Sequence, residues 1–464
     1  MTKQSNIHFE ISERKILLRL FDILSISLAL YGFSYFSGFD YIKIDETHWR
    51  WLVVLVIYVM GFGTVFELYD LKKSSKIETV TNAILLTTSV TVLVYLLTPY
   101  YTPTLPENRI QILYFYLAIL FPLLLWRLAY ITFIASPRFY KRALLVGETS
   151  SIEAVVSSIK KADPNYQIIG FINCEAEKED SIKFKGITEY KANQIHEIIS
   201  EENISEIVIA SYNSETISSS IYVDLTTLLE RGYPVREYTQ VYEDMSYRVP
   251  VQFIGKDFYK DFPFSRNNKN RFYLAYRRFF DVILSVFGVL CSLVVLPFIV
   301  IGNAIGNRGP LLYSQERVGK NGKPFKIFKF RSMVTNAEAG GAVWAQKNDS
   351  RVTAFGRFLR TTRLDELPQL INIIKGEMSI IGPRPERPMF VNELAQVIPF
   401  YHTRHIVKPG LTGWAQVNAR YGSSIDDSLV KLEYDLYYIK HRGFLLDFNI
   451  IIKTLSTVIF FRGQ

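Results

Sequence analysis

Two adjacent carboxylates, Asp365 and Glu366, stand among arginines in the most informative part of this sequence. Residues 360–369 read RTTRLDELPQ, and Arg384 follows between two prolines. An ionised carboxylate can attack phosphorus, a neighbouring carboxylate can hold a divalent ion, and fixed cations can neutralise phosphate charge. The residue types and their spacing therefore predict chemistry on a phosphate group.

The acids are expected at the start of a helix. Residues 364–375 predict a helix closed by Gly376, and Pro368 is tolerated in the first turn. The helix dipole and the nearby arginines would favour ionised carboxylates. Adjacent helical residues diverge by about 100°, so both acids can border one metal–phosphate centre without sharing a proton. Acids in a first turn are, taken alone, more typical of helix capping.

A hairpin is predicted upstream of the acids. Apolar runs at 311–317 and 325–330 flank the sequence GKNG at 319–322, and Asn-Gly between such runs indicates a tight turn. Strand alternation places Lys329 and Arg331 on one face. Two cations on one face could hold a diphosphate, and the alternative is a basic edge that faces lipid headgroups.

Composition points to a membrane and an anionic partner. Hydrophobic residues make up 49% of the 464 residues, mean hydropathy is +0.12, and the formal net charge is +9. Lysines and arginines beside apolar segments favour anionic lipid headgroups over nucleic acid. The two cysteines are far apart in the sequence, so neither a disulfide nor a sulfur-based metal site is expected.

Four apolar segments in the first third of the chain each approach the roughly 20 residues that span a bilayer as a helix. They are residues 16–36, 51–69, 79–97 and 110–134. Cations precede the first segment, separate the second from the third and follow the fourth. This distribution predicts a bundle with both ends in the cytoplasm.

Three ionisable residues fall inside these segments, namely Asp22, Glu67 and Arg127. Asp22 lies one helical turn from Arg19, so a local ion pair is expected. Arg127 lies late in its segment, so a side chain that extends to the membrane interface is expected.

The middle of the chain alternates short strands with helices. The strands are expected at 142–146, 167–172, 206–210 and 233–236, with helices at 152–161, 192–200 and 217–231. This alternation predicts a parallel, doubly wound sheet. Gly147 is followed by Glu148 instead of further glycines, and Glu148 would repel a pyrophosphate. We expect a Rossmann-like domain without a bound nucleotide, and a homodimer through this domain is a hypothesis.

A later apolar run, residues 282–305, contains Pro297 and has basic residues on both sides. Its length alone predicts a spanning helix. The basic residues on both flanks predict that both ends lie on the cytoplasmic face, which conflicts with a spanning helix. A helix that breaks at Pro297 and returns to the same face resolves this conflict. The apolar tail at 444–461, which is interrupted by polar residues, predicts an interfacial helix.

Long motifs follow the acids in fixed order. Residues 376–385 read GEMSIIGPRP, residues 408–420 read KPGLTGWAQVNAR, and residues 434–440 read YDLYYIK. From about Arg271 to its end, the chain resembles the bacterial sugar transferase family, the polyprenyl-phosphate hexose-1-phosphate or monotopic phosphoglycosyl transferases. The helical bundle and the middle domain resemble the large subgroup of that family.

The resemblance implies transfer of a sugar 1-phosphate from a UDP-sugar to undecaprenyl phosphate on the cytoplasmic face of the inner membrane. Such a reaction starts exopolysaccharide, capsule or O-antigen assembly. Asp365 would attack the sugar-bearing phosphorus, release UMP and carry the phosphosugar before undecaprenyl phosphate accepts it. Glu366, together with Asp365, would bind Mg²⁺.

The resemblance also implies a set of substrate-binding residues. Arg360 would neutralise charge beside the acids, and the other candidates are Lys329, Arg331, Arg351, Arg384, Gln416 and Arg420. Two positions depart from many relatives, which have Ser where this chain has Leu296 and Gly where it has Ala419. Neither departure touches the acid pair.

The predicted architecture is a membrane protein in three parts. Residues 1–138 form a four-helix transmembrane bundle, and residues 139–266 form a Rossmann-like α/β domain. Residues 267–464 form an α+β phosphoglycosyl transferase domain with a re-entrant helix at 279–306.

Two other functions compete with this one. A membrane-anchored nucleotide-sugar dehydratase needs a glycine-rich turn and a Tyr-x-x-x-Lys pair, and the middle domain contains neither. A non-catalytic polysaccharide length regulator has no need for the acid pair. The identity of the sugar stays open.

Overall fold

The computed structural model describes residues 11–36, 41, 48–74, 77–134, 140–163, 165–174, 187–211, 217–254, 258, 265–337, 349–419, 422 and 424–459. The chain divides into two compact units, one formed largely by residues before 237 and the other by Glu237–Gln464. The predicted boundaries at residues 138 and 266 stay predictions.

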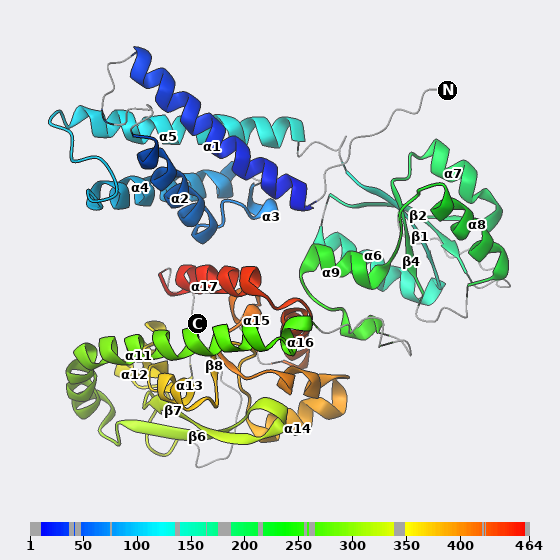
Figure 1. Cartoon of the computed structure of the whole chain (residues 1–464). Coiled ribbons are helices and arrows are strands. Elements are labelled where there is room, and N and C mark those ends of the chain that lie inside the picture. The colour runs from blue at the N-terminus through cyan, green and yellow to red at the C-terminus, as the bar shows by residue number, and fades with distance from the viewer. Residues whose placement is uncertain are drawn as a thin grey trace. The chain divides into compact units, whose positions relative to one another are not determined.

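The first unit begins with a helical bundle, drawn in blue and cyan in Figure 1. Its main helices are α1 (Ile11–Phe36), α2 (Trp49–Val65), α4 (Ile77–Leu97) and α5 (Ile110–Ala129), with a short α3 (Leu71–Ser74) and a π turn, η1 (Tyr130–Ile134). They pack around buried apolar side chains such as Leu55, Ile84 and Phe115. Other apolar side chains, such as Leu20, Leu24 and Leu125, are exposed, as expected for helices that contact lipid.

Within the described residues, four helices are long and apolar enough to cross a membrane. They cover residues 13–35, 77–97 and 110–134 in the bundle and residues 271–307 in the second unit. Helix α2 is apolar but has only 17 residues. It ends before Glu67, whose backbone has a φ of 61°, so Glu67 lies outside the helix in which it was predicted.

A buried ion pair joins α1 to α5. Arg127 Nη2 lies 3.0 Å from Asp22 Oδ2, and both side chains are at most 1% exposed. The predicted partner of Asp22 was wrong, because Arg19 instead lies over the Tyr69 ring at 5.1 Å. The predicted extension of Arg127 to the interface was also wrong. In an apolar bundle an opposite charge on a neighbouring helix is a stronger partner than a distant interface.

We predict that Asp22→Leu destabilises the bundle by about 3–5 kcal/mol, because it leaves the Arg127 guanidinium buried without a counter-charge. Adding Arg127→Met should recover most of this loss. The measurement is thermal unfolding of the purified protein in detergent, with Leu24→Val on the exposed face of α1 as the control. A double variant as unstable as Asp22→Leu would contradict the pairing.

The first unit also contains a five-stranded sheet in the order β3-β2-β1-β4-β5. The strands are β1 (Arg142–Gly147), β2 (Gln167–Asn173), β3 (Thr188–Tyr190), β4 (Glu206–Ala210) and β5 (Val235–Glu237). Pairing is parallel between β1 and β2, β1 and β4, and β2 and β3, which confirms the predicted parallel sheet. Strand β3 was not predicted, since it has only three residues and no apolar run.

Helices α6 (Thr149–Ala162), α7 (Ile195–Glu201) and α8 (Ser219–Glu230) accompany the sheet. Its chain order reverses between β1 and β4, where Ser151 Oγ donates to the Ala210 carbonyl at 3.0 Å. A Cβ at Gly147 would lie 2.6 Å from that carbonyl oxygen. Gly147 therefore serves close packing of the two strands.

The second unit begins with α9 (Tyr238–Ser246) and the residues after it. Glu243 accepts hydrogen bonds from Lys440 Nζ at 2.7 Å, and Trp414 Nε1 donates to the Tyr247 carbonyl at 3.1 Å. The Val249 amide donates to the Glu433 carbonyl at 3.1 Å. This segment therefore packs directly on the elements that carry the KPGLTGWAQVNAR and YDLYYIK motifs.

Glu433 is a buried carboxyl at this contact, with Oε2 3.4 Å from Arg248 Nη1. Burial raises the pKa of Glu433 from 4.5 to about 7, although Arg248 opposes the shift. The folded state thus holds this proton more tightly than the unfolded chain. Stability conferred by the proton is complete below about pH 4.5 and is lost as pH rises through about 7.

We predict that the free energy of unfolding of this unit falls between about pH 5 and pH 7.5, and that Glu433→Gln flattens this dependence. Denaturant unfolding of both proteins across that range measures it. Glu377→Gln, which removes an exposed carboxyl of the same unit, is the control. A slope unchanged in Glu433→Gln would contradict the assignment.

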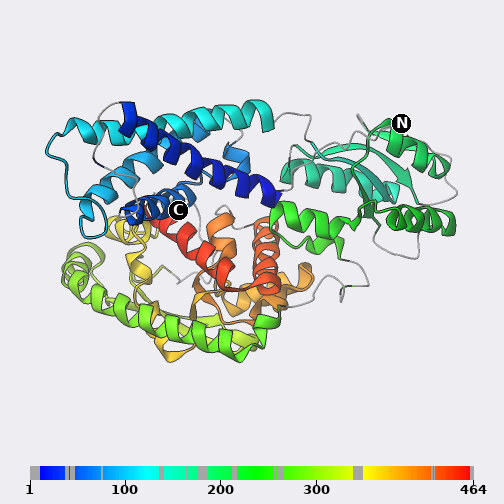
Figure 2. The same cartoon turned by 45° about the horizontal axis from the view of Figure 1, so that its top comes forward.

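A long helix, α11 (Arg271–Gly302), underlies the second unit and continues as a π turn, η7 (Asn303–Asn307). Pro297 lies inside the helix rather than at its end. The green ribbon changes direction along its later part in both views (Figures 1 and 2). Phe287, Val294 and other large apolar side chains on it are exposed. A re-entrant path stays a prediction.

The first half of α11 is fastened to the rest of the unit by charged side chains. Arg278 Nη1 donates to the Ile373 carbonyl at 2.6 Å, and Arg277 Nη2 donates to Ser379 Oγ at 2.7 Å. Asp281 Oδ1 accepts the Ile380 amide at 2.9 Å. These contacts tie the apolar helix to the elements on either side of Gly376.

The predicted hairpin is confirmed. Strands β6 (Leu312–Val318) and β7 (Pro324–Phe330) pair antiparallel, and the turn contains Asn321 with φ 56° and Gly322 with φ 76°. The left-handed backbone explains the Asn-Gly sequence. The remaining elements are α12 (Ala354–Thr361), α13 (Gln369–Lys375), β8 (Ser379–Ile381), α14 (Pro388–Val397), η10 (Tyr401–Ile406), β9 (Gly410–Thr412), α15 (Trp414–Asn418), α16 (Ile425–His441) and α17 (Phe444–Ile459).

The two charged residues of α17 bind other elements of the unit, whereas Asn449 is exposed. Asp447 accepts the hydroxyls of Tyr273 at 2.6 Å and Tyr438 at 2.9 Å, and Lys453 Nζ donates to Asn418 Oδ1 at 2.6 Å. Phe444, Leu445, Phe448 and Leu455 are exposed. A helix with one polar, protein-bound face and one apolar, exposed face fits the predicted interfacial position.

Candidate active site

Asp365 and Glu366 lie in a short 3₁₀ turn, η9 (Leu364–Glu366), between α12 and α13. This differs from the single helix predicted over 364–375. Helix α13 begins only at Gln369, because Pro368 lacks the N–H that a continuous helix would use. The turn buries both carboxylates, at 6% and 7% exposure. Gly376, with φ 87°, closes α13 as predicted.

Three cations hold the Glu366 carboxylate. Its Oε1 accepts hydrogen bonds from Arg384 Nη2 at 2.8 Å and Lys329 Nζ at 3.0 Å, and Arg363 Nη1 lies 3.5 Å from Oε2. Burial by itself would raise the pKa of Glu366, but Lys329, Arg384 and Arg363 hold it well below its ordinary value. Glu366 is therefore a fixed negative charge.

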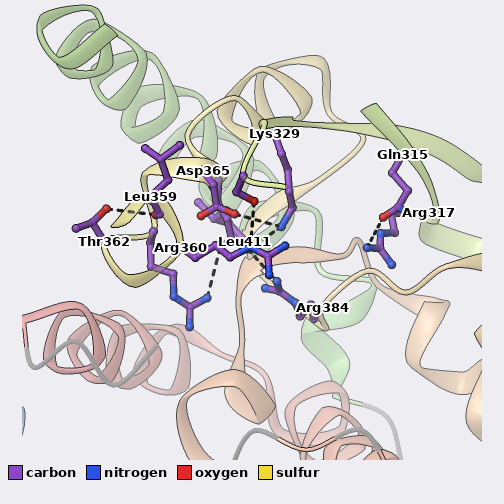
Figure 3. Close-up of polar contacts among 12 residues, drawn as sticks. Gln315, Arg317, Lys329, Leu359, Arg360, Thr362, Asp365, Arg384 and Leu411 are labelled. Carbon is purple, nitrogen blue, oxygen red and sulfur yellow. Dashed lines mark hydrogen bonds and ion pairs between the residues drawn. The ribbon is translucent and has the colours of Figure 1, made fainter. Parts of the chain in front are cut away.

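Asp365 is held less firmly. Lys329 Nζ lies 4.0 Å from its Oδ2, and Figure 3 shows the two side chains close together beside Arg384. Burial raises the pKa of Asp365 and the charge of Glu366 adds to this, whereas Lys329 and Arg360 oppose it. Of the two carboxylates, Asp365 thus has fewer close contacts with cations.

Arginine side chains around the acids come from several elements. Arg360 on α12 donates from Nε to Ser332 Oγ at 3.0 Å, and its charge acts on Asp365 (Figure 3). Arg317 on β6 donates to Gln315 Oε1 at 2.7 Å. Burial lowers the pKa of Arg317 to about 10, and the charge of Arg384 contributes to the same shift.

Sequence reasoning missed Arg363, Ser332 and Arg317. Arg363 precedes Glu366 by three residues, a spacing that predicts contact on a helical turn. Ser332 and Arg317 gave no comparable signal, because their roles depend on how the hairpin packs against η9.

The structure brings together four of the predicted site residues by direct charged contacts: Lys329, Asp365, Glu366 and Arg384. Gln416 Nε2 donates at 2.9 Å to the carbonyl of Leu411, which is labelled in Figure 3.

Two predicted residues form contacts elsewhere. Arg331 Nε donates to the Pro310 carbonyl at 2.9 Å, and Arg351 binds both carboxylate oxygens of Asp349, at 2.9 and 2.6 Å. The predicted role of these two arginines in substrate binding stays a prediction. Arg420 lies outside the described residues.

The acid pair fits a magnesium ion that is bound together with phosphate. Mg²⁺ prefers oxygen ligands and is usually held by one or two carboxylates, with water and phosphate in the remaining positions. Asp365 and Glu366 supply two carboxylates in one turn. Among the described residues, no group of three or more His, Cys, Asp or Glu could hold a metal alone. Mg²⁺ binding remains a proposal.

Comparison with known proteins places this geometry in a family. The model of a family described as "Bacterial sugar transferase" matches residues 272–461. A Bacillus subtilis (strain 168) protein, named as a putative undecaprenyl-phosphate N-acetylgalactosaminyl 1-phosphate transferase, is 49% identical over 141 residues. These residues are 30% of this chain and 79% of that protein. The chain belongs to the bacterial sugar transferase family.

Other members resemble it over the same part of the chain. An Aeromonas hydrophila protein is 50% identical over 151 residues, which cover 32% of this chain and 36% of that protein. It is named a UDP-N-acetylgalactosamine-undecaprenyl-phosphate N-acetylgalactosaminephosphotransferase. The UDP-glucose:undecaprenyl-phosphate glucose-1-phosphate transferase of Escherichia coli (strain K12) is 41% identical over 179 residues, or 38% of each chain. The matches thus span little more than a third of these two relatives.

We predict that Lys329→Met lowers turnover by about 10²- to 10³-fold, because two adjacent carboxylates then lack the cation that lies between them. The pKa of Asp365 would rise further, since Lys329 is the main charge that lowers it. The measurement is the rate of sugar-phosphate transfer by the purified wild-type protein and by the variant.

Lys326→Met is the matched control for this test. Lys326 is an exposed residue on the same strand, and strand alternation places its side chain on the opposite face. Equal losses in the two variants would show that a lysine on this strand matters for solubility or membrane contact and not for the acid pair.

Proposed function

We propose that this bacterial sugar transferase moves a sugar 1-phosphate from a UDP-sugar to undecaprenyl phosphate through a phosphosugar carried on Asp365. The product, an undecaprenyl diphosphate sugar, would start exopolysaccharide, capsule or O-antigen assembly. The observation that carries the proposal is the pair of buried neighbouring carboxylates, of which Glu366 is fixed by three cations and Asp365 is not. The names of the relatives support the reaction class.

In the first step an Asp365 carboxylate oxygen attacks the phosphorus that bears the sugar. A bond forms between this oxygen and phosphorus, and the bond from phosphorus to the bridging oxygen breaks. UMP leaves with that oxygen. Arg384 and Lys329 border the place where negative charge develops, and fixed cations there lower the barrier without reorganisation.

In the second step a phosphate oxygen of undecaprenyl phosphate attacks the same phosphorus. The bond between Asp365 and phosphorus breaks, and the carboxylate is regenerated. The burial that raises the pKa of Asp365 also makes its carboxylate a better nucleophile than a fully solvated one. Two displacements at one phosphorus fit a pair in which Glu366 is bound by three cations and Asp365 by fewer.

Mg²⁺, bound by Glu366 and Asp365 together with phosphate oxygens of the donor, would supply further neutralisation of charge on the diphosphate. Glu366 keeps the negative charge that such an ion needs, because its pKa lies well below its ordinary value. Its three cationic partners also orient its carboxylate before the donor arrives.

The reaction is proposed to occur at the cytoplasmic face of the inner membrane, where a lipid acceptor and a nucleotide sugar can meet. The exposed apolar side chains of α11 and α17 support contact with lipid on the same unit that carries the acids. A re-entrant path for α11 would keep this unit on the side of its soluble donor.

The relatives suggest which donor to test first. The two that are named for N-acetylgalactosamine are 49% and 50% identical to this chain, whereas those named for glucose are 38–41% identical over their matched regions. We propose an N-acetylhexosamine donor, with UDP-N-acetylgalactosamine ahead of UDP-glucose.

The test measures UMP release by purified protein with Mg²⁺ and undecaprenyl phosphate across a panel of UDP-sugars. We predict release with one or two donors and a loss of at least about 10³-fold in Asp365→Asn, because an amide is a poor nucleophile at phosphorus. Asp426→Asn, which changes an exposed acid of the same unit, should be unaffected.

Three results would contradict the proposal. No release with any UDP-sugar would contradict the reaction, and release by Asp365→Asn would remove Asp365 as nucleophile. Without acceptor, the two-step route predicts about one UMP per enzyme, so the absence of such a burst would favour direct transfer.

A further inference from the structure

The backbone around Arg384 is anchored at successive points. The Gly410 amide donates to the Pro383 carbonyl at 2.8 Å, and the Val318 amide donates to the Glu386 carbonyl at 2.9 Å. Between these two backbone contacts, the Arg384 carbonyl is bound by a side chain instead, at 3.1 Å from Arg404 Nη2.

Arg384 has a particular need for this contact. Prolines on both sides restrict its backbone, and neither proline has an N–H with which to bind a neighbouring element. Its side chain is 42% exposed and reaches Glu366 Oε1 at 2.8 Å. The position of the backbone largely determines where such a long, partly exposed side chain can reach. Of the three hydrogen-bonded carbonyls, only that of Arg384 belongs to the same residue as this side chain.

Arg404 is itself held rigidly inside the unit. Its Nη2 also donates to Asp435 Oδ2 at 2.7 Å, and its Nη1 donates to the Tyr401 hydroxyl at 2.7 Å. Arg404 is 5% exposed and Asp435 is 1% exposed. Three partners on η10, α16 and the Arg384 loop thus fix the planar guanidinium, a geometry that the single ammonium of lysine cannot reproduce.

We propose that Arg404, held by Asp435 and Tyr401, is a positioning residue that sets the place of Arg384 and thereby the binding of the donor's diphosphate. The inference rests on the proposed function, since it assigns Arg384 to a diphosphate. It also gives a purpose to Asp435 in the YDLYYIK motif, which does not reach the acid pair. Burial alone would not justify this role, because buried ion pairs are weak evidence even for stability.

The decisive property is coupling between Arg404 and Arg384. If Arg404 acts through Arg384, its substitution must matter only while the Arg384 side chain is present. If Arg404 merely supports the fold, its effect must add to that of Arg384 substitution. A double-mutant cycle separates these cases, because independent residues give additive effects and coupled residues do not.

The experiment measures the affinity of UDP for the full-length protein in detergent by calorimetry, in the presence of Mg²⁺. The variants are Arg404→Lys, Arg384→Ala and the double variant. We expect Arg404→Lys to weaken UDP binding by roughly tenfold to a hundredfold, as small misplacements of binding groups do. In the Arg384→Ala background the same change should have no further effect.

Arg248→Lys is the matched control. Arg248 also pairs with an acid on α16, Glu433, at 3.4 Å, but it lies over the rings of Tyr242 and Tyr434 and not against the Arg384 carbonyl. Tyr401→Phe is a milder second variant that removes only one hydrogen bond to Arg404. It should weaken UDP binding in the same direction, and it keeps the test valid should Arg404→Lys fold poorly.

Equal weakening by Arg404→Lys with and without the Arg384 side chain would overturn the inference. So would unchanged affinity in Arg404→Lys and Tyr401→Phe, or the absence of UDP binding by the wild-type protein. The proposed function is judged separately by UMP release. A wild-type protein that releases UMP but shows no coupling rejects only the positioning role, and one that binds UDP with coupling but releases no UMP rejects only the reaction.

Discussion

The second unit depends on keeping two neighbouring carboxylates ionised inside the protein. Like charges on Asp365 and Glu366 repel each other, and burial disfavours both. Lys329 resolves this conflict from the hairpin, and Arg384 does so from the proline-framed loop. The hairpin, the 3₁₀ turn and the loop are separate in sequence. The fold as a whole therefore brings together the cations that stabilise the two buried carboxylates.

Local signals in the sequence predicted local structure well. The Asn-Gly turn predicted the hairpin, and Gly376 predicted the end of α13, because both positions need a left-handed backbone that few residues adopt. The acid pair and its main cations were likewise found from residue type and spacing. Arg331 and Arg351 bind the Pro310 carbonyl and Asp349, contacts that only the folded chain reveals, and their role in substrate binding stays a prediction.

Contacts between residues far apart in the chain could not be predicted from the sequence. The Asp22 partner is 105 residues away, and a nearer arginine was available on the same helix. One contact of the KPGLTGWAQVNAR run was also hidden, since Tyr247 carries no motif yet its carbonyl accepts a hydrogen bond from Trp414 Nε1. The match to the family model begins at residue 272, so this support comes from outside the matched region.

The Asp22–Arg127 pair has a consequence for biosynthesis. Translation proceeds at roughly 5–20 residues per second, so Asp22 emerges roughly 5–20 s before the arginine that neutralises it. During that interval α1 carries an unpaired carboxyl that lipid does not tolerate. If Asp22 stays charged, the first helix is therefore expected to remain in the insertion machinery or at the lipid boundary until the last helix of the bundle arrives.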